Sequence, residues 1–207
     1  MDKTPIAKSS QPNGEIPYKQ EAYYGVRGHS PRKLRIFARF AQLVPAKEFF
    51  NIAAKSRGAL VVYYFAYGSN LNWPQMQRRC PSSKFVTIAK LPGYQFGITR
   101  HSRLRDCGTA NVYPVAGNEV WGAVYEVSDA DLTVMDGFED GYQRATLSVY
   151  PPDKTDQALQ VLVYVAAIES NVPRPNPEYK RLILEGAHYW NIPASYIAML
   201  ERIQTGS

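Results

Sequence analysis

The most constraining stretch of the chain is an aromatic run, Val62 to Leu71, that ends in a small polar turn. Tyr63 to Phe65 carry the bulky side chains that suit a buried strand. Gly68 interrupts the run, because glycine tolerates backbone conformations closed to other residues and lets a ligand approach the main chain. Asn72 is typical of a helix N-cap, so a helix should follow and run to about Arg79.

A strand, a glycine turn and a helix start combine free main-chain N–H groups with the positive end of a helix dipole. Such a combination can bind an anion. Ser69 and Asn70 add side-chain donors at the same place. An ordinary strand-to-helix turn has the same pattern, so both interpretations stay open on this motif alone.

Short strands and helices alternate after this turn. Pro92-Gly93 indicates a turn and Gly117-Asn118 indicates a hairpin, while His101 to Gly108 has the composition of a polar loop. The expected strands are 60–66, 85–91, 94–99, 109–114, 119–127, 144–150 and 158–165, and the expected helices are 73–79, 129–135, 178–189 and 194–203. This order predicts an α+β fold, in which a mixed sheet or a small barrel is flanked by helices.

The positive charge is concentrated in an N-terminal extension. Residues 1–58 hold 11 Lys and Arg against 4 Asp and Glu, whereas residues 59–207 hold 13 against 14. We therefore divide the chain into a basic extension, 1–58, and a main domain, 59–207. The extension should begin as a flexible arm and continue, from Ser30-Pro31, as basic amphipathic helices. Such helices can pack on their own domain, lie on an anionic membrane surface or bind a partner.

Composition excludes several classes of protein. The main domain is nearly neutral, which argues against nucleic-acid binding. Cys80 and Cys107 lack the spacing of a disulfide framework or a zinc site. Residues 1–11 lack the apolar core of a signal peptide. We therefore expect a cytoplasmic protein that needs neither a metal nor a cofactor.

The segment Asp136 to Tyr142 is the strongest candidate for acid–base chemistry. Three carboxylates, those of Asp136, Glu139 and Asp140, lie close together in a segment that also holds two glycines, Gly137 and Gly141. Mutual repulsion and partial burial would raise the pKa of one of them, and such a carboxylate accepts a proton near neutral pH. An acidic surface turn is the competing interpretation.

Four pieces of the main domain together resemble the γ-glutamylcyclotransferase family, which includes the AIG2-like proteins. The resemblance extends from about Val62 to about Gln204, and the order and spacing of its pieces make it far more specific than the first piece alone. The pieces are Tyr67 to Leu71, Gly117 to Tyr125 with its Val-Trp-Gly core, Asp136 to Tyr142, and Pro175 to Lys180 with the Gly186-Ala187 and Ile192-Pro193 pairs that follow.

The resemblance implies a small closed barrel of mixed strands with helices outside. It also implies release of 5-oxoproline from a γ-glutamyl amino acid, peptide or amine, by a metal-independent enzyme of the lyase or acyltransferase type. Glu139 matches the family's general acid/base. The substrate-binding residues implied by the resemblance are Tyr67, Gly68, Ser69, Asn70, Leu71, Tyr142, Tyr164 and Tyr179.

A non-catalytic alternative starts from the basic extension. The same barrel would bind a ligand without converting it, and residues 1–58 would direct it to a membrane or an acidic partner. The sequence leaves open the γ-glutamyl compound used, the choice between general and pathway-specific metabolism, and whether the chain forms a homodimer.

Overall fold

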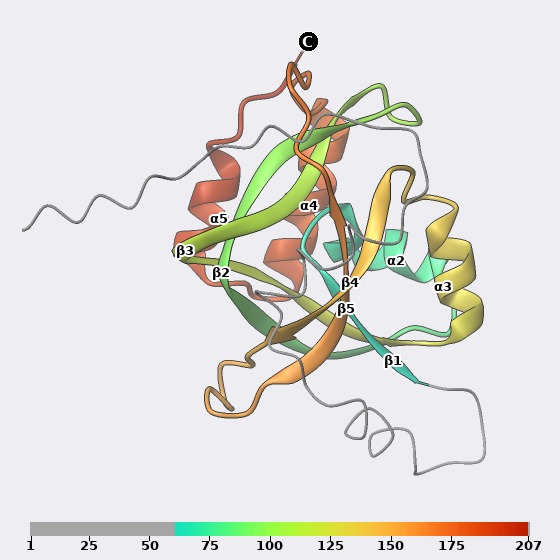
Figure 1. Cartoon of the computed structure of the whole chain (residues 1–207), viewed down its shortest axis with the longest axis vertical. Coiled ribbons are helices and arrows are strands. Elements are labelled where there is room, and N and C mark those ends of the chain that lie inside the picture. The colour runs from blue at the N-terminus through green and yellow to red at the C-terminus, as the bar shows by residue number, and fades with distance from the viewer. Residues whose placement is uncertain (1–60, 207) are drawn as a thin grey trace, which may run out of the picture. The chain divides into compact units, whose positions relative to one another are not determined.

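The computed structural model describes residues 61–206, so the arm and helices expected within residues 1–58 lie outside the described part of the chain. The described residues form an α+β fold (Figure 1). In chain order the elements are β1 (Val62–Ala66), the 3-10 helix η3 (Ser69–Leu71), α2 (Trp73–Arg79), β2 (Lys84–Ser102), β3 (Cys107–Val127), α3 (Asp129–Asp136), β4 (Tyr142–Val149), β5 (Leu159–Ala166), α4 (Pro177–Tyr189) and α5 (Ala194–Glu201).

The strands form one mixed, five-stranded sheet in the order β2-β3-β1-β5-β4. β1 lies in its centre, antiparallel to β3 and parallel to β5. Phe65 and Ala66 of β1 are fully buried, because a central strand is covered on both sides. The aromatic run that precedes the polar turn is therefore the middle of the core, and the turn begins where β1 leaves the sheet.

The expected closed barrel is wrong, because the described sheet stays open between β2 and β4. One isolated bridge joins Lys90 of β2 to Tyr150, with main-chain N–H to O distances of 2.9 and 2.8 Å. The next hydrogen-bonded pairs of such an antiparallel ladder would include Pro92 on one side and Pro152 on the other. Proline has no N–H to donate, so the ladder ends after a single bridge.

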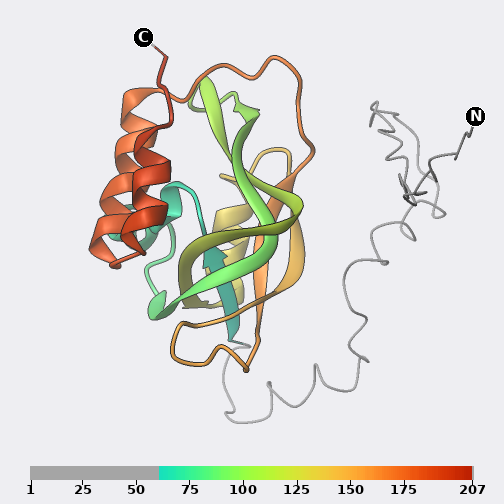
Figure 2. The same ribbon diagram turned by 90° about the vertical axis from the view of Figure 1, so that its left-hand side faces the viewer.

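The region from Lys84 to Val127 is one long hairpin rather than two short ones. The chain reverses at residues 103–106, so neither Pro92-Gly93 nor Gly117-Asn118 is the turn that the sequence predicted. Gly93 and Gly117 have φ angles of 75° and 82°, and the pairing register shifts between them. Neither glycine ends a strand, and glycines with positive φ at a register shift are typical of a bulge that bends a strand. Figure 2 shows the hairpin curving along its length.

Helix starts are where the sequence predicts them. The Asn72 side chain accepts a hydrogen bond from the Gln75 amide at 3.0 Å and caps α2. Ser128 caps α3 in a reciprocal capping box with Asp131. The two caps fix the directions in which the chain leaves the polar turn and approaches the acidic segment.

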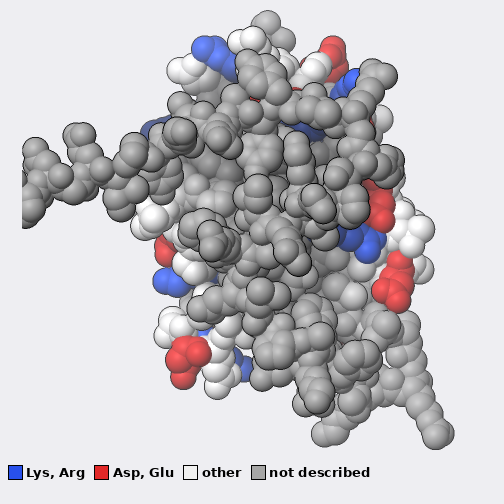
Figure 3. Space-filling model, in the orientation of Figure 1, with Lys and Arg blue, Asp and Glu red and all other residues white. Residues whose placement is uncertain are grey.

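Charges of both signs occur on the face of the molecule that Figure 3 shows. Where Figure 3 shows described residues, basic and acidic side chains are interspersed and no single sign dominates. This distribution agrees with the near-neutral charge of residues 59–207. Between residues 61 and 206, no helix combines the length and the apolar character needed to cross a bilayer.

α4 packs directly against the polar turn. Gly186 of α4 lies so close to Leu71 that a Cβ at this position would overlap the Leu71 carbonyl group. Trp190, just after α4, stacks on Phe85 with 3.8 Å between ring centroids and meets Trp73 edge-on at 5.6 Å. Figures 1 and 2 show α5 beside α4 on the same side of the molecule. The turn is thus held between the sheet and a helix more than a hundred residues away in the sequence.

Gly186→Ala should therefore destabilise the protein by about 1–3 kcal/mol, because the added methyl group meets main-chain atoms that cannot rotate away. Gly137→Ala is the matched control, since Gly137 has right-handed helical angles, φ −67° and ψ −21°, that alanine adopts without strain. Chemical denaturation of both variants measures the difference. Equal stabilities for the two variants would contradict the close approach of α4 to the turn.

Candidate active site

Side chains from distant elements hold the turn Gly68 to Leu71 in place. The Trp190 indole N–H donates to the Leu71 carbonyl at 2.9 Å, and the Tyr125 hydroxyl donates to the Asn70 carbonyl at 3.3 Å. The first amides of a helix have no acceptor within the helix, so those of Ser69 and Asn70 are available to a ligand. Both residues, together with Gly68, line a cavity.

Asn70 connects the turn to the other polar groups of this cavity. Its Oδ1 accepts from Arg79 Nη1 at 2.9 Å and from Gln75 Nε2 at 3.1 Å. Its Nδ2 donates to the Tyr64 hydroxyl at 2.9 Å and reaches Glu139 Oε1 at 3.4 Å. The amide is 4% exposed, so these partners fix its orientation and leave little freedom for the groups it touches.

Glu139 lies in the tight turn between α3 and β4. The Phe138 amide donates to the Met135 carbonyl at 2.8 Å, and the Tyr142 amide donates to the Glu139 carbonyl at 2.9 Å. Gly141 adopts a φ of 79°, which returns the chain to the sheet. The carboxylate of Glu139 is half-buried and lines the same cavity as Gly68 to Asn70. The two motifs are therefore brought together from 69 residues apart.

Burial raises the pKa of Glu139 to about 7. The nearby Arg79 and Arg105 guanidinium groups and the Asn70 hydrogen bond act in the opposite direction, since each favours the ionised form. A carboxylate with this pKa exchanges protons readily near neutral pH. The group is thus suited to act first as a base and then as an acid.

The other two carboxylates of the acidic segment contribute little to this shift. Tyr164 donates to Asp136 at 2.7 Å and Arg144 pairs with it at 2.6 Å, and these contacts lower the pKa of Asp136. Asp140 points into solvent beside Arg100. Repulsion from Asp136 is the smallest of the influences identified on Glu139. The expected raised pKa of one carboxylate thus arises from burial, with repulsion between neighbours a minor cause.

The predicted tyrosines line the cavity, and their hydroxyl groups are tied to the protein. Tyr67 donates to the Tyr164 carbonyl at 2.6 Å, and Tyr142 donates to the Ala110 carbonyl at 2.6 Å. The Tyr179 hydroxyl accepts from the Ala110 amide at 2.9 Å. Tyr164 also lines the cavity, but its hydroxyl turns to the carboxylate of Asp136.

Leu71 differs from the other predicted site residues. It is 1% exposed, packs in the core and does not line the cavity. Its contribution is its carbonyl group, which accepts the Trp190 hydrogen bond. Leu71 therefore supports the turn from behind.

The sequence analysis missed several polar residues of the cavity wall or its support, among them Gln75, Arg79 and Arg105. Gln75 and Arg79 are four residues apart on α2, so they share one helix face, and this spacing could have identified them. Arg105 comes from the reversal of the long hairpin, where no local pattern distinguishes it. Its Nη2 donates to Gln75 Oε1 at 2.9 Å, and its guanidinium lies 5.1 Å from the Tyr179 ring centroid.

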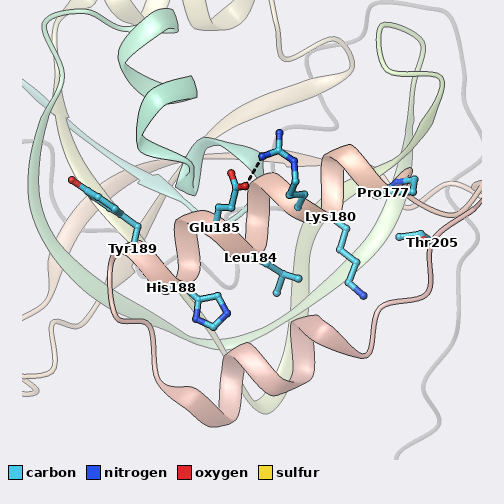
Figure 4. A pocket seen from close by; sticks show the side chains of 8 residues that line it. Pro177, Lys180, Leu184, Glu185, His188, Tyr189 and Thr205 are labelled. Carbon is cyan, nitrogen blue, oxygen red and sulfur yellow. Dashed lines mark hydrogen bonds and ion pairs between the residues drawn. The ribbon is translucent and has the colours of Figure 1, made fainter.

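A second hollow lies on the outer surface of α4 (Figure 4). Lys180, Leu184, Glu185 and His188 line it, and it shares no lining residue with the cavity around Glu139. Among residues 61–206, no group of three or more His, Cys, Asp or Glu side chains is arranged to hold a metal ion. Of these two sites, the cavity around Glu139 is the one that combines a carboxylate of raised pKa with the turn Gly68 to Asn70.

A family model described as "Gamma-glutamyl cyclotransferase, AIG2-like" matches residues 64–190. The chain belongs to this family. The γ-glutamylcyclotransferase of Homo sapiens is 29% identical over 148 residues, which cover 68% of this chain and 78% of the human protein. That of Bos taurus is 29% identical over 147 residues, with the same coverage. A solved γ-glutamyl cyclotransferase structure is similar with a TM-score of 0.65 and 26% identity, over 71% of this chain and 90% of that chain. The resemblance drawn from the four motifs is confirmed.

The raised pKa of Glu139 predicts a pH-dependent stability. Between its usual pKa of 4.5 and about 7, the folded chain holds a proton that the unfolded chain releases. The free energy of unfolding should therefore fall as the pH rises through this window. Between pH 5 and pH 8, the free energy of unfolding of the wild type should fall by about 1–3 kcal/mol more than that of Glu139→Gln. Chemical denaturation at the two pH values measures this difference. The same pH dependence in both proteins would contradict the shift.

Arg79 should lower the pKa of Glu139, because a guanidinium favours the nearby carboxylate. In Arg79→Gln the pKa of Glu139 should therefore rise, which NMR titration of the 13C-labelled glutamate carboxyl groups can measure. Arg78→Gln is the matched control, since Arg78 is the exposed neighbour on the same helix. An unchanged or lower pKa in Arg79→Gln would exclude Arg79 as a cation acting on Glu139.

Proposed function

We propose that this chain is a γ-glutamyl cyclotransferase that releases 5-oxoproline from a γ-glutamyl compound. The main support is a half-buried carboxylate, Glu139, with a pKa of about 7, in the same cavity as the first amides of η3. Membership of the family and the names of its relatives point to the same reaction. The proposed chemistry is that of a lyase or acyltransferase and requires no metal.

The glutamyl half of the substrate would lie with its α-carboxylate at the turn Gly68 to Asn70. Main-chain amides are suitable donors to a carboxylate, and those of Ser69 and Asn70 open η3. The contacts of Trp190 and Tyr125 behind the turn keep these donors in a fixed position. Donors that are fixed in advance do not have to reorganise when the substrate binds or reacts.

The proposed reaction begins when Glu139 takes a proton from the substrate's α-ammonium group. The freed amine attacks the γ-carbonyl carbon and closes a five-membered ring, which gives a tetrahedral intermediate. Glu139 then gives its proton to the departing nitrogen as the original amide C–N bond breaks. The ring nitrogen still carries two protons; Glu139 takes one of them and passes it to the released amine, so the lactam N–H and an ammonium group are formed and Glu139 is ionised again. Because nucleophile and electrophile belong to one molecule, holding the substrate curled removes much of the entropic cost of attack.

The tyrosines would shape the cavity around the curled substrate. Burial raises the pKa of Tyr67, Tyr142 and Tyr179, so their hydroxyl groups stay protonated at neutral pH. Tyr67 and Tyr142 direct these protons to main-chain carbonyls, which orients the rings. We assign them to substrate binding and Glu139 to proton transfer. We also propose a reducing, cytoplasmic setting, in keeping with two buried free cysteines.

Glu139→Gln should lower kcat/KM for γ-glutamyl-alanine by about a hundredfold or more, because glutamine cannot accept the proton. The assay measures 5-oxoproline and free alanine, which should appear in equal amounts. Glu126→Gln is a control of the same chemistry at a surface ion pair with Lys84. It should leave the rate unchanged.

Two results would contradict the proposal. The proposed activity is wrong if the wild type forms no 5-oxoproline from a broad panel of γ-glutamyl compounds. A Glu139→Gln variant as active as wild type would remove the assigned role of Glu139. Folding of each variant is checked by its far-UV circular dichroism, so that loss of activity is not confused with loss of structure.

A further inference from the structure

The two arginines at the cavity differ from the other arginines around it. Arg100 pairs with Glu169, and Arg144 pairs with Asp136. Within residues 61–206, neither Arg79 nor Arg105 lies within 4.0 Å of a carboxylate oxygen. Both guanidinium groups line the cavity, whose carboxylates are those of Glu139 and Asp140. Guanidinium donors that no carboxylate of the described residues occupies can bind an additional anion.

Arg79 is bound to the turn assigned to the glutamyl half. Its Nη1 donates to Asn70 Oδ1 at 2.9 Å, and its guanidinium lies 4.4 Å from the Phe138 ring centroid. Arg105 also makes one guanidinium hydrogen bond among residues 61–206, but its partner does not belong to the turn. A guanidinium has five N–H donors, and in the described residues one hydrogen bond, to Gln75, uses them. The remaining donors of Arg105 can accept a carboxylate, which the planar guanidinium binds in a bidentate manner.

The position of Arg105 is fixed from both sides. Its amide donates to Ser102 Oγ at 3.3 Å, and its carbonyl accepts from Asn176 Nδ2 at 3.4 Å. Asn176 also caps α4, so the tip of the long hairpin is tied to the start of that helix. The Tyr179 ring, 5.1 Å away, supports the guanidinium. This arrangement holds a charged donor at the cavity wall at little cost in side-chain entropy on binding.

We propose that Arg105 forms a subsite for a carboxylate on the leaving group, next to the departing nitrogen. This inference rests on the proposed function and narrows its substrate class. Substrates whose leaving group is an amino acid carry such a carboxylate, whereas γ-glutamyl amines do not. The α-carboxylate of the glutamyl half is already assigned to the turn, so it does not compete for Arg105. Ser102, which lies beside Arg105 in the cavity wall, offers a further hydroxyl donor.

The test compares two substrates that differ only at this group, γ-glutamyl-alanine and γ-glutamyl-alaninamide. Wild type should prefer γ-glutamyl-alanine in kcat/KM. In Arg105→Gln this preference should fall by about tenfold or more, mainly through KM, because one charge-assisted bidentate contact is lost. Activity toward the amide should change by less than about threefold. Comparing variant with wild type cancels the different intrinsic reactivities of the two substrates.

Two further variants complete the experiment. Arg105→Lys keeps the charge without the planar fork and should retain part of the preference. Arg103→Gln removes an exposed arginine from the same hairpin tip and should retain all of it. Partial rescue by lysine distinguishes recognition of charge from a purely structural role of residue 105.

The outcomes separate this inference from the function on which it rests. The subsite is wrong if wild type forms 5-oxoproline from both substrates without preferring one. It is also wrong if Arg105→Gln loses the same factor in kcat/KM for both. Neither outcome contradicts the cyclotransferase activity. No 5-oxoproline from either substrate would overturn the proposed function, and the subsite with it.

Discussion

The close contact between α4 and the polar turn is the constraint on which the cavity depends. Gly186 lets the helix meet the Leu71 carbonyl group, and Trp190 satisfies that carbonyl with an indole N–H at 2.9 Å. A short helix with unsatisfied first amides would otherwise be stabilised by few contacts of its own. Here Trp190, just after α4 and 119 residues further along the chain than Leu71, holds it from behind. Among residues 61–206, no acceptor is hydrogen-bonded to the Ser69 and Asn70 amides, which can therefore bind a ligand on the side facing the cavity.

Charge balance in the cavity follows from how its parts are assembled. Burial raises the pKa of Glu139, because it disfavours the ionised form. The guanidinium groups of Arg79 and Arg105 counteract this effect, and the resulting pKa is about 7. Neither arginine is adjacent to Glu139 in the sequence. The proton affinity of this carboxylate is thus a property of the fold, and the acidic character of its own segment has little influence on it.

Local chemistry explains which features the sequence revealed. Asn72 and Ser128 cap their helices through side-chain contacts three residues away, so each is readable from a few letters of sequence. The turn predicted at Gly93 and the hairpin predicted at Gly117 were wrong, because a positive φ serves a bulge as well as a turn. Only pairing across the sheet decides between them. Closure of the sheet was mispredicted because it also depends on pairing between distant strands. The sheet would close only if pairing between β2 and β4 continued beyond the single bridge between Lys90 and Tyr150.

The two sides of the cavity therefore differ in how they are encoded. The side assigned to the glutamyl half comes from β1, η3 and α2, which are consecutive in the chain and follow one another through local turns and caps. The side that carries Arg105 comes from a hairpin tip docked on the N-cap of α4, at Asn176, and no local pattern predicts that contact. A change in the tip would alter the surroundings of a leaving group without moving Glu139 or the amides of η3. In such an architecture the proton-transfer chemistry can stay constant while the preferred leaving group changes.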